Sequence, residues 1–169
     1  NSNNKFPSNM QMEMSEQAAT NLVPRIRMAM LYAVAQSMNG RVANTGNLSE
    51  RYIGWTTYNG DSLGDFAPLA NFTSDEVIAM GNTYKYLDFV VNKVPADGLT
   101  GKTDEEKTGI PYSVLNKYIR TGICEDEAIK EKIDRMNERS AFKFEPMPTF
   151  DLDEYLEDID CFDEEDWEE

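Results

Sequence analysis

Apolar residues divide the chain into segments of helical spacing separated by short polar turns. From Ser15 onward the spacing predicts a helix, and its apolar positions, among them Met28 and Met38, fall on nearly all of its sides. A helix of this kind is typical of a buried element, so we expect it in the core. Arg25 and Arg27 stand near its start, where cations oppose the helix dipole and need either an acidic neighbour or a bound anion.

The next segment has the order of parts found in nucleotide sites. A short strand is expected over Arg41–Asn44, followed by a polar turn over Thr45–Asn47 and a helix that begins near Asn47. In open α/β sheets, ligands lie beyond the carboxyl ends of the strands, where backbone N–H groups and helix N-termini point at phosphate. The pattern therefore predicts a nucleotide site within residues 40–69.

Capping signals and helix breakers place the later elements. Capping boxes are expected at Thr73 with Glu76 and at Thr103 with Glu106, and Gly81 interrupts the first of these helices. Pro111 and Gly122 bound a short helix over Tyr112–Ile119, and the last helix is expected over Glu125–Ser140. Leu87–Val91 is a short apolar run, and Asn92–Lys102, with its Pro and Gly residues, is typical of a loop that covers a site.

Negative charge is concentrated at one end of the chain. The 169 residues carry a formal net charge of −15, but residues 150–169 hold 12 acidic residues and no Lys or Arg, so the rest is close to neutral. The sequence has no stripe of basic and aromatic residues of the kind that binds nucleic acid. Its longest uncharged apolar run, Met28–Ala35, is far shorter than the roughly 20 residues that span a bilayer. We expect one domain with a small-molecule partner, no nucleic acid and no membrane, and two widely separated cysteines favour the cytoplasm.

The chain contains no histidine, which excludes Ser-His-Asp and Cys-His catalysis and every His-ligated metal site. Carboxylates, hydroxyls, Lys and Arg remain, and these suit Mg²⁺ and phosphates. Thr45 and Glu50 are a candidate pair for phosphate and Mg²⁺, although a Glu in the first turn of a helix also compensates the dipole. Asp61 and Asp65 each follow a Gly and could bind ribose hydroxyls or an amide, or could simply form turns.

Several longer motifs follow one another in a fixed order. They are Asn21-Leu-Val-Pro-Arg-Ile-Arg-Met28, Asn44-Thr-Gly-Asn-Leu-Ser-Glu50, Gly60-Asp-Ser-Leu-Gly-Asp-Phe-Ala-Pro-Leu69, Asn71-Phe-Thr-Ser-Asp-Glu-Val77 and Pro95-Ala-Asp-Gly-Leu-Thr-Gly-Lys-Thr-Asp-Glu-Glu106. The series resembles the carboxyl-terminal part of NAD synthetase of the ammonia-dependent type, from about Asn21 to Phe150. The resemblance implies an α/β, adenine-nucleotide alpha-hydrolase-like (Rossmann-like) three-layer fold and a homodimer whose site borrows from both subunits.

The resemblance also implies a reaction and a set of site residues. ATP activates the nicotinate carboxylate of deamido-NAD as an acyl-adenylate, and ammonia then displaces AMP to give NAD, with Mg²⁺ as the metal. Residue by residue, Arg25, Asp65 and Lys143 fall at positions that contact deamido-NAD. Thr45 falls at a position that contacts ATP, and Glu50 falls on the Mg²⁺ ligand.

The chain also departs from the pattern of this family. It has no Ser-Gly-Gly-x-Asp-Ser loop, the element that binds pyrophosphate, so we expect a partial domain over residues 21–148 that lacks an amino-terminal segment and is inactive alone. Residues 1–20 are a polar lead-in and residues 149–169 an acidic tail. Four departures within the match are Tyr58 for Lys or Arg, Ser74 for Lys, Val94-Pro95 for a Thr region and Phe142 for His.

Two alternatives stay open. The chain could be a catalytically silent nucleotide-binding or assembly subunit whose acidic tail docks on a partner, and the departures at Tyr58 and Ser74 keep that interpretation open. It could also be a related pyrophosphatase acting on another carboxylate, although the Gly-Asp and Pro-Ala-Asp-Gly-Leu segments match NAD synthetase in particular.

Overall fold

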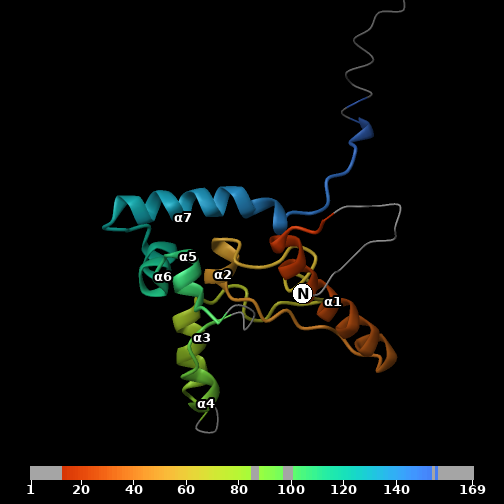
Figure 1. The fold of residues 1–169 in the computed structure, drawn as a ribbon, viewed down its shortest axis with the longest axis horizontal. Helices are drawn as coiled ribbons and strands as arrows, with labels where there is room; N and C mark the ends of the chain where they lie inside the picture. The colour runs from red at the N-terminus through yellow and green to blue at the C-terminus, as the bar shows by residue number, and fades with distance from the viewer. Residues whose placement is uncertain (1–12, 85–87, 97–100, 154, 156–169) are drawn as a thin grey trace, which may run out of the picture.

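The computed structural model describes residues 13–84, 88–96, 101–153 and 155 (Figure 1). Its helices are α1 (Glu16–Ser37), α2 (Leu48–Tyr52), α3 (Ser74–Gly81), α4 (Asp88–Val91), α5 (Asp104–Thr108), α6 (Tyr112–Thr121), α7 (Glu127–Ser140) and the 3-10 turn η2 (Ala141–Lys143). The predictions for the first 12 residues, for Leu87 and for most of the acidic tail lie outside the described residues.

Helix α1 is solvent-exposed along most of its length. Ser15 caps it by accepting a hydrogen bond from the N–H of Ala18 at 3.2 Å. The prediction of a buried helix is wrong for this chain, since Leu31, Val34 and Met38 expose 52%, 55% and 76% of their surface while Met28 is buried. Figure 1 shows the reason, because α1 stands to one side of the other helices and only part of its circumference meets the rest of the chain.

The expected strand over Arg41–Asn44 is reduced to a single bridge. Ala43 pairs in parallel with Phe66, and no named strand occurs in the described ranges. The N–H of Asn44 donates to the carbonyl of Phe66 at 2.8 Å, and the N–H of Asp65 donates to the carbonyl of Val42 at 2.7 Å. This segment is extended, but it finds one short partner instead of the neighbouring strands that would continue a parallel ladder.

The helix boundaries follow the capping signals closely. Both expected capping boxes are present, and a third joins Asn47 to Glu50 at the start of α2. Pro111 precedes α6, and Gly122 ends it with a φ of 71°. The last helix begins at Glu127 instead of Glu125, because the side chain of Asp126 is the N-cap and accepts from two backbone N–H groups.

The core is small and is built from the helices that follow the nucleotide-site segment. Ile53 at the end of α2, Ile110, Leu115 of α6 and Ile133 of α7 are its fully buried members. Burying a side chain of this size contributes about 1.5–3 kcal/mol, so four of them hold α2, α6 and α7 together. Among the described residues, none of the helices has the length and apolar character that spanning a bilayer requires.

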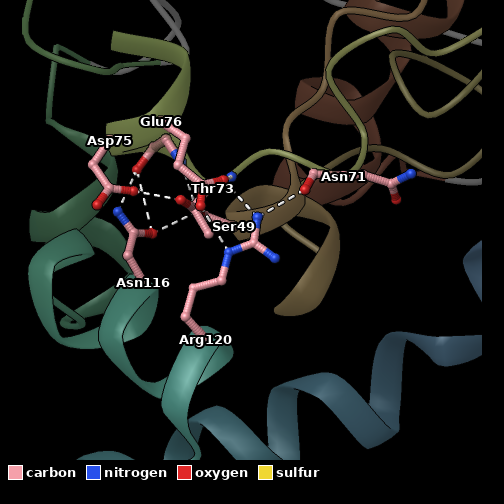
Figure 2. Close-up of polar contacts among 8 residues, drawn as sticks. Ser49, Asn71, Thr73, Asp75, Glu76, Asn116 and Arg120 are labelled. Atoms are coloured by element: carbon pink, nitrogen blue, oxygen red, sulfur yellow. Dashed lines mark hydrogen bonds and ion pairs between the residues drawn. The ribbon is translucent and has the colours of Figure 1, made fainter. Parts of the chain in front are cut away.

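A polar network lies beside this core and joins α2, α3 and α6 (Figure 2). Ser49 of α2 donates to Asn116 of α6 at 2.6 Å, and the N–H of Ser74 in α3 donates to the Ser49 hydroxyl at 2.9 Å. Nearer the surface, Arg120 binds both carboxylate oxygens of Glu76 at 2.8 and 2.5 Å. The three helices are therefore locked to one another by polar as well as apolar contacts.

Candidate functional site

Two adjoining cavities lie along the segment that runs from Asn44 to Ser62. Their volumes are about 230 Å³ and about 740 Å³. They share five lining residues, namely Asn44, Thr45, Trp55, Thr56 and Asp61. Residues of α1 line the larger cavity, and residues of α2 and α5 line the smaller one. The nucleotide-site segment predicted from the sequence thus forms the common wall of both cavities.

Asn44 shapes the turn that carries Thr45 between the cavities. Its buried side chain donates to the carbonyls of Asp61 at 3.0 Å and Leu63 at 2.8 Å and accepts from the N–H of Gly46 at 2.9 Å. Gly64 lies against it so closely that an added Cβ would meet Asn44 atoms at 2.7 Å. These contacts fix the turn, and Thr45 lines both cavities as a result.

Glu50 and Asp104 bring carboxylates to the smaller cavity. Glu50 Oε2 accepts from the N–H of Asn47 at 3.0 Å as part of the helix cap, which does not use Oε1. Burial raises the pKa of Glu50, the Asn47 N–H opposes this shift, and the charges of Asp104 and Asp61 add to it. Asp104 is 6% exposed, and its Oδ1 is buried without a hydrogen-bond partner among the described residues.

Tyr112 stands beside these carboxylates. Its hydroxyl lies 3.5 Å from Asp104 Oδ2, a long contact that leaves the Asp104 carboxylate poorly satisfied. Burial raises the pKa of Tyr112 well above its usual range, and the negative charges of Glu50 and Asp104 raise it further. Three carboxylates, those of Glu50, Asp61 and Asp104, therefore line the smaller cavity, and a cation bound there would offset their charge.

The carboxylates of the smaller cavity are of the kind that Mg²⁺ binds, but they do not form a complete ligand set. In the described part of the chain, no three acidic, His or Cys side chains are arranged to hold a metal ion by themselves. Mg²⁺ in nucleotide enzymes is usually held by one or two carboxylates together with substrate phosphates, and not by an all-protein cage. A buried carboxylate oxygen of Asp104 without a donor, together with the Glu50 carboxylate in the wall of the same cavity, fits that kind of site.

Lys143, at the end of η2, is one of the residues that line the larger cavity. Its ammonium donates to the carbonyls of Gly54 and Thr56, each at 2.8 Å, so two of its three N–H groups are used and one remains for a ligand. Burial lowers the pKa of Lys143, and Asp61 opposes that shift. Gly54 has a φ of 64°, and a Cβ on it would lie 2.0 Å from the Cβ of Ser140. The end of α7 therefore fits tightly over the loop that lines the site.

Arg25 and Asp65 are placed differently from the other predicted site residues. Arg25 Nε donates to the carbonyl of Tyr58 at 3.1 Å, and Asp65 Oδ2 accepts from the N–H of Val42 at 2.7 Å. Neither side chain lines the two cavities, whereas Arg27 lines the larger one. The structure thus brings Thr45, Glu50 and Lys143 together and leaves Arg25 and Asp65 at the margin.

The departures noted in the sequence have distinct environments. Ser74 is buried in the polar network and lines neither cavity, and Tyr58 packs on Phe142 with ring centroids 5.4 Å apart. Asp104 also lines the smaller cavity, although no pattern in the sequence singled it out. It directly follows the N-cap Thr103, where acids are common for dipole reasons, so no pattern distinguished it.

Comparison with known proteins decides the family. The sequence model of the NAD synthase family matches residues 2–148. This chain belongs to the NAD synthase family. It is 35% identical to the NH(3)-dependent NAD(+) synthetase of Mycoplasmopsis pulmonis over 75% of this chain and 49% of that relative. It is 39% identical to the one of Archaeoglobus fulgidus, over 80% of this chain and 57% of that relative.

Solved structures of this family have a similar fold. The NMN synthetase of Francisella tularensis has a TM-score of 0.72 at 33% identity, over 78% of this chain and 56% of that one. The NH3-dependent NAD synthetase of Campylobacter jejuni, solved with nitrate ion, has a TM-score of 0.62 at 21% identity, over 85% of this chain and 58% of that one. The chain spans about half the length of the curated relatives it matches.

Proposed function

We propose that this chain supplies the deamido-NAD side, and part of the ATP side, of an ammonia-dependent NAD synthetase. The observation that carries the proposal is the grouping of Thr45, Glu50 and Lys143 around two adjoining cavities in a chain of the NAD synthase family. Curated relatives named NH(3)-dependent NAD(+) synthetase support the same activity. The full reaction is a proposal because the chain spans about half of those relatives.

We assign the chain to the carboxyl-terminal portion of an α/β, adenine-nucleotide alpha-hydrolase-like three-layer fold. Two observations support this assignment. Ala43 and Phe66 form a parallel bridge, the beginning of a parallel ladder, and α1 exposes Leu31 and Val34. An amino-terminal half would add neighbouring strands, cover α1 and bring the loop that binds pyrophosphate.

In the proposed reaction, ATP activates the nicotinate carboxylate of deamido-NAD and releases pyrophosphate, and ammonia then displaces AMP to give NAD. Thr45, in the wall shared by both cavities, donates a hydrogen bond from its hydroxyl to a phosphate oxygen of ATP. Mg²⁺, when bound, neutralises phosphate charge and favours departure of the pyrophosphate. Glu50 would hold the ion through its carboxylate from the wall of the smaller cavity.

The dinucleotide contacts come from the other predicted residues. Lys143 donates its remaining N–H to deamido-NAD in the larger cavity. Arg25 and Asp65 lie outside both cavities, so we propose that they contact the part of the dinucleotide that extends beyond them, in a homodimer whose two subunits share the site. Because these contacts exist only in the folded protein, deamido-NAD at 100 times its dissociation constant should stabilise it by about 2.7 kcal/mol.

Mixing the chain with the amino-terminal half of a relative tests the proposal. NAD and pyrophosphate should appear together, in a reaction that needs ATP, Mg²⁺ and ammonia, whereas the chain alone should form no NAD. Glu50→Gln in the mixture should reduce the rate far more than the affinity for deamido-NAD. A folded complex that binds the dinucleotide without turnover would favour the silent subunit instead.

A second candidate function is the synthesis of NMN instead of NAD. The Francisella tularensis protein is an NMN synthetase, so the mononucleotide version of the same amidation is an alternative for this chain. Parallel assays with deamido-NAD and with nicotinate mononucleotide separate the two. Preference for the mononucleotide by tenfold or more in kcat/KM would replace deamido-NAD as the assigned substrate.

A further inference from the structure

The buried polar network beside the core is centred on one amide side chain. Asn116 uses both ends of its amide, accepting from the Ser49 hydroxyl at 2.6 Å and donating to the Ser74 hydroxyl at 3.0 Å. Ser49 is 0% exposed and its hydroxyl also accepts from the N–H of Ser74 at 2.9 Å. Figure 2 shows Asn116 reaching from α6 to the start of α2 and α3.

Helix α2 depends on these contacts for its orientation. It has five residues, too few to be stable as an isolated helix, so its position is set by what it packs against. Ser49 and Ile53 are four residues apart and share the buried face, with Ile53 in the apolar core and Ser49 on Asn116. Two anchors of different chemistry thus fix the rotation of α2 about its axis.

Glu50 follows Ser49 directly and is turned about 100° from it around the helix. That turn brings Glu50 to the smaller cavity while Ser49 stays in the interior. A rotation of α2 that released Ser49 from Asn116 would move the Glu50 carboxylate relative to Thr45 and Asp104, which line the same cavity. The network has no contact of its own with either cavity, since neither Ser49 nor Asn116 lines one.

We infer that Asn116 and Ser49 are positioning residues that hold the Glu50 carboxylate at the geometry required for a divalent cation carried by phosphates. This inference rests on the proposed function, because it takes Glu50 as the Mg²⁺ ligand. It assigns to α6, which lies outside both cavities, control over the metal affinity of the site.

Binding of Mn²⁺ in the presence of ATP, followed by the EPR signal of the free ion, tests the inference in the chain combined with the amino-terminal half. Ser49→Ala and Asn116→Leu each remove the Ser49–Asn116 hydrogen bond. Ser74→Ala is the matched control, because it removes a buried hydroxyl from the same network but keeps that hydrogen bond and the backbone N–H of residue 74. Ile133→Val is the control for core destabilisation, since Ile133 belongs to the apolar core and not to the polar network.

The inference predicts at least tenfold weaker Mn²⁺ binding in Ser49→Ala and Asn116→Leu, with Ser74→Ala and Ile133→Val within twofold of the parent. The Mg²⁺ concentration for half-maximal rate should rise in parallel, while kcat at saturating Mg²⁺ changes little. Parent-like Mn²⁺ affinity in both test variants would overturn the inference and leave the proposed function standing, because NAD formation is measured separately. Equal weakening in all four variants at matched melting temperatures would also overturn it, as would a parent that makes NAD without binding Mn²⁺.

Discussion

Substitution of Gly54 by Ala adds a single Cβ atom and should strongly reduce the stability of the folded protein. Gly54 adopts a φ of 64°, where an Ala side chain costs about 1–2 kcal/mol. The added Cβ would also lie 2.0 Å from the Cβ of Ser140, and overpacking of this kind costs typically about 1–3 kcal/mol. We therefore expect the free energy of unfolding to fall by about 2–5 kcal/mol.

A double-mutant cycle separates the two causes. Ser140→Gly removes the atoms that the new Cβ would meet, although it forfeits the hydrogen bond from the Ser140 hydroxyl to the carbonyl of Met136 at 2.7 Å. In the double variant only the backbone cost of Gly54→Ala and the cost of Ser140→Gly remain. The double variant should therefore be more stable than the two single losses imply, by about 1–3 kcal/mol of coupling.

Urea unfolding followed by far-UV circular dichroism measures all four corners of the cycle, because α7 and α6 supply much of the helical signal. Additive losses would refute the steric argument and reduce the cost of Gly54→Ala to its backbone conformation. A loss below about 1 kcal/mol in the single variant would refute both arguments, since the left-handed conformation alone accounts for that much.

Three further predictions concern charge. Burial raises the pKa of Glu50 in the folded state, so its contribution to stability is present below its ordinary pKa of 4.5 and is lost as pH rises through the raised value. Glu50→Gln should flatten that part of the pH profile of stability measured in urea. An unchanged profile would count against the shift. The hydrogen bonds from Arg120 lower the pKa of Glu76 from 4.5 to about 2, so its contribution to stability is present above pH 4.5 and is lost as pH falls toward 2. Thermal melts of Glu76→Gln should lack this loss of stability at acid pH. A loss equal to that of the parent would assign it to another group. Ser74→Lys introduces the residue that the family resemblance implies at this position, but it buries an ammonium in the polar network. It should therefore lower the melting temperature without tightening ATP binding, and tighter binding at full stability would show that the side chain reaches the site.

Local signals in the sequence predict local structure well here. The Thr73–Glu76 and Thr103–Glu106 capping boxes and the glycine at 122 are decided by hydrogen bonds within a few residues, so their outcome does not depend on the rest of the fold. The strand at Arg41–Asn44 and the burial of α1 depend on partners distant in sequence, and both predictions were wrong because the described chain provides little for either to pack against.

In the candidate site, too, local sequence predicts some residues, while others depend on contacts distant in sequence. Thr45 and Glu50 are five residues apart on one turn and helix, so their convergence on the smaller cavity follows from local geometry. Lys143 reaches the site from far along the chain, and its position was implied only by the family resemblance. Asp104 could not be foreseen, because its unsatisfied carboxylate oxygen is a property of packing, and an acid at the first turn of a helix has an ordinary explanation.

The contact between Lys143 and the loop at Gly54 and Thr56 determines when the wall of the larger cavity can form during translation. The two hydrogen bonds join residues 89 and 87 positions apart, so the acceptors leave the ribosome long before their donor. Until α7 and η2 have emerged, the loop lacks its two hydrogen bonds to Lys143, and the larger cavity lacks that lining residue. Nascent chains arrested before Lys143 should therefore form the larger cavity incompletely, and its wall should be complete only after Lys143 has left the ribosome.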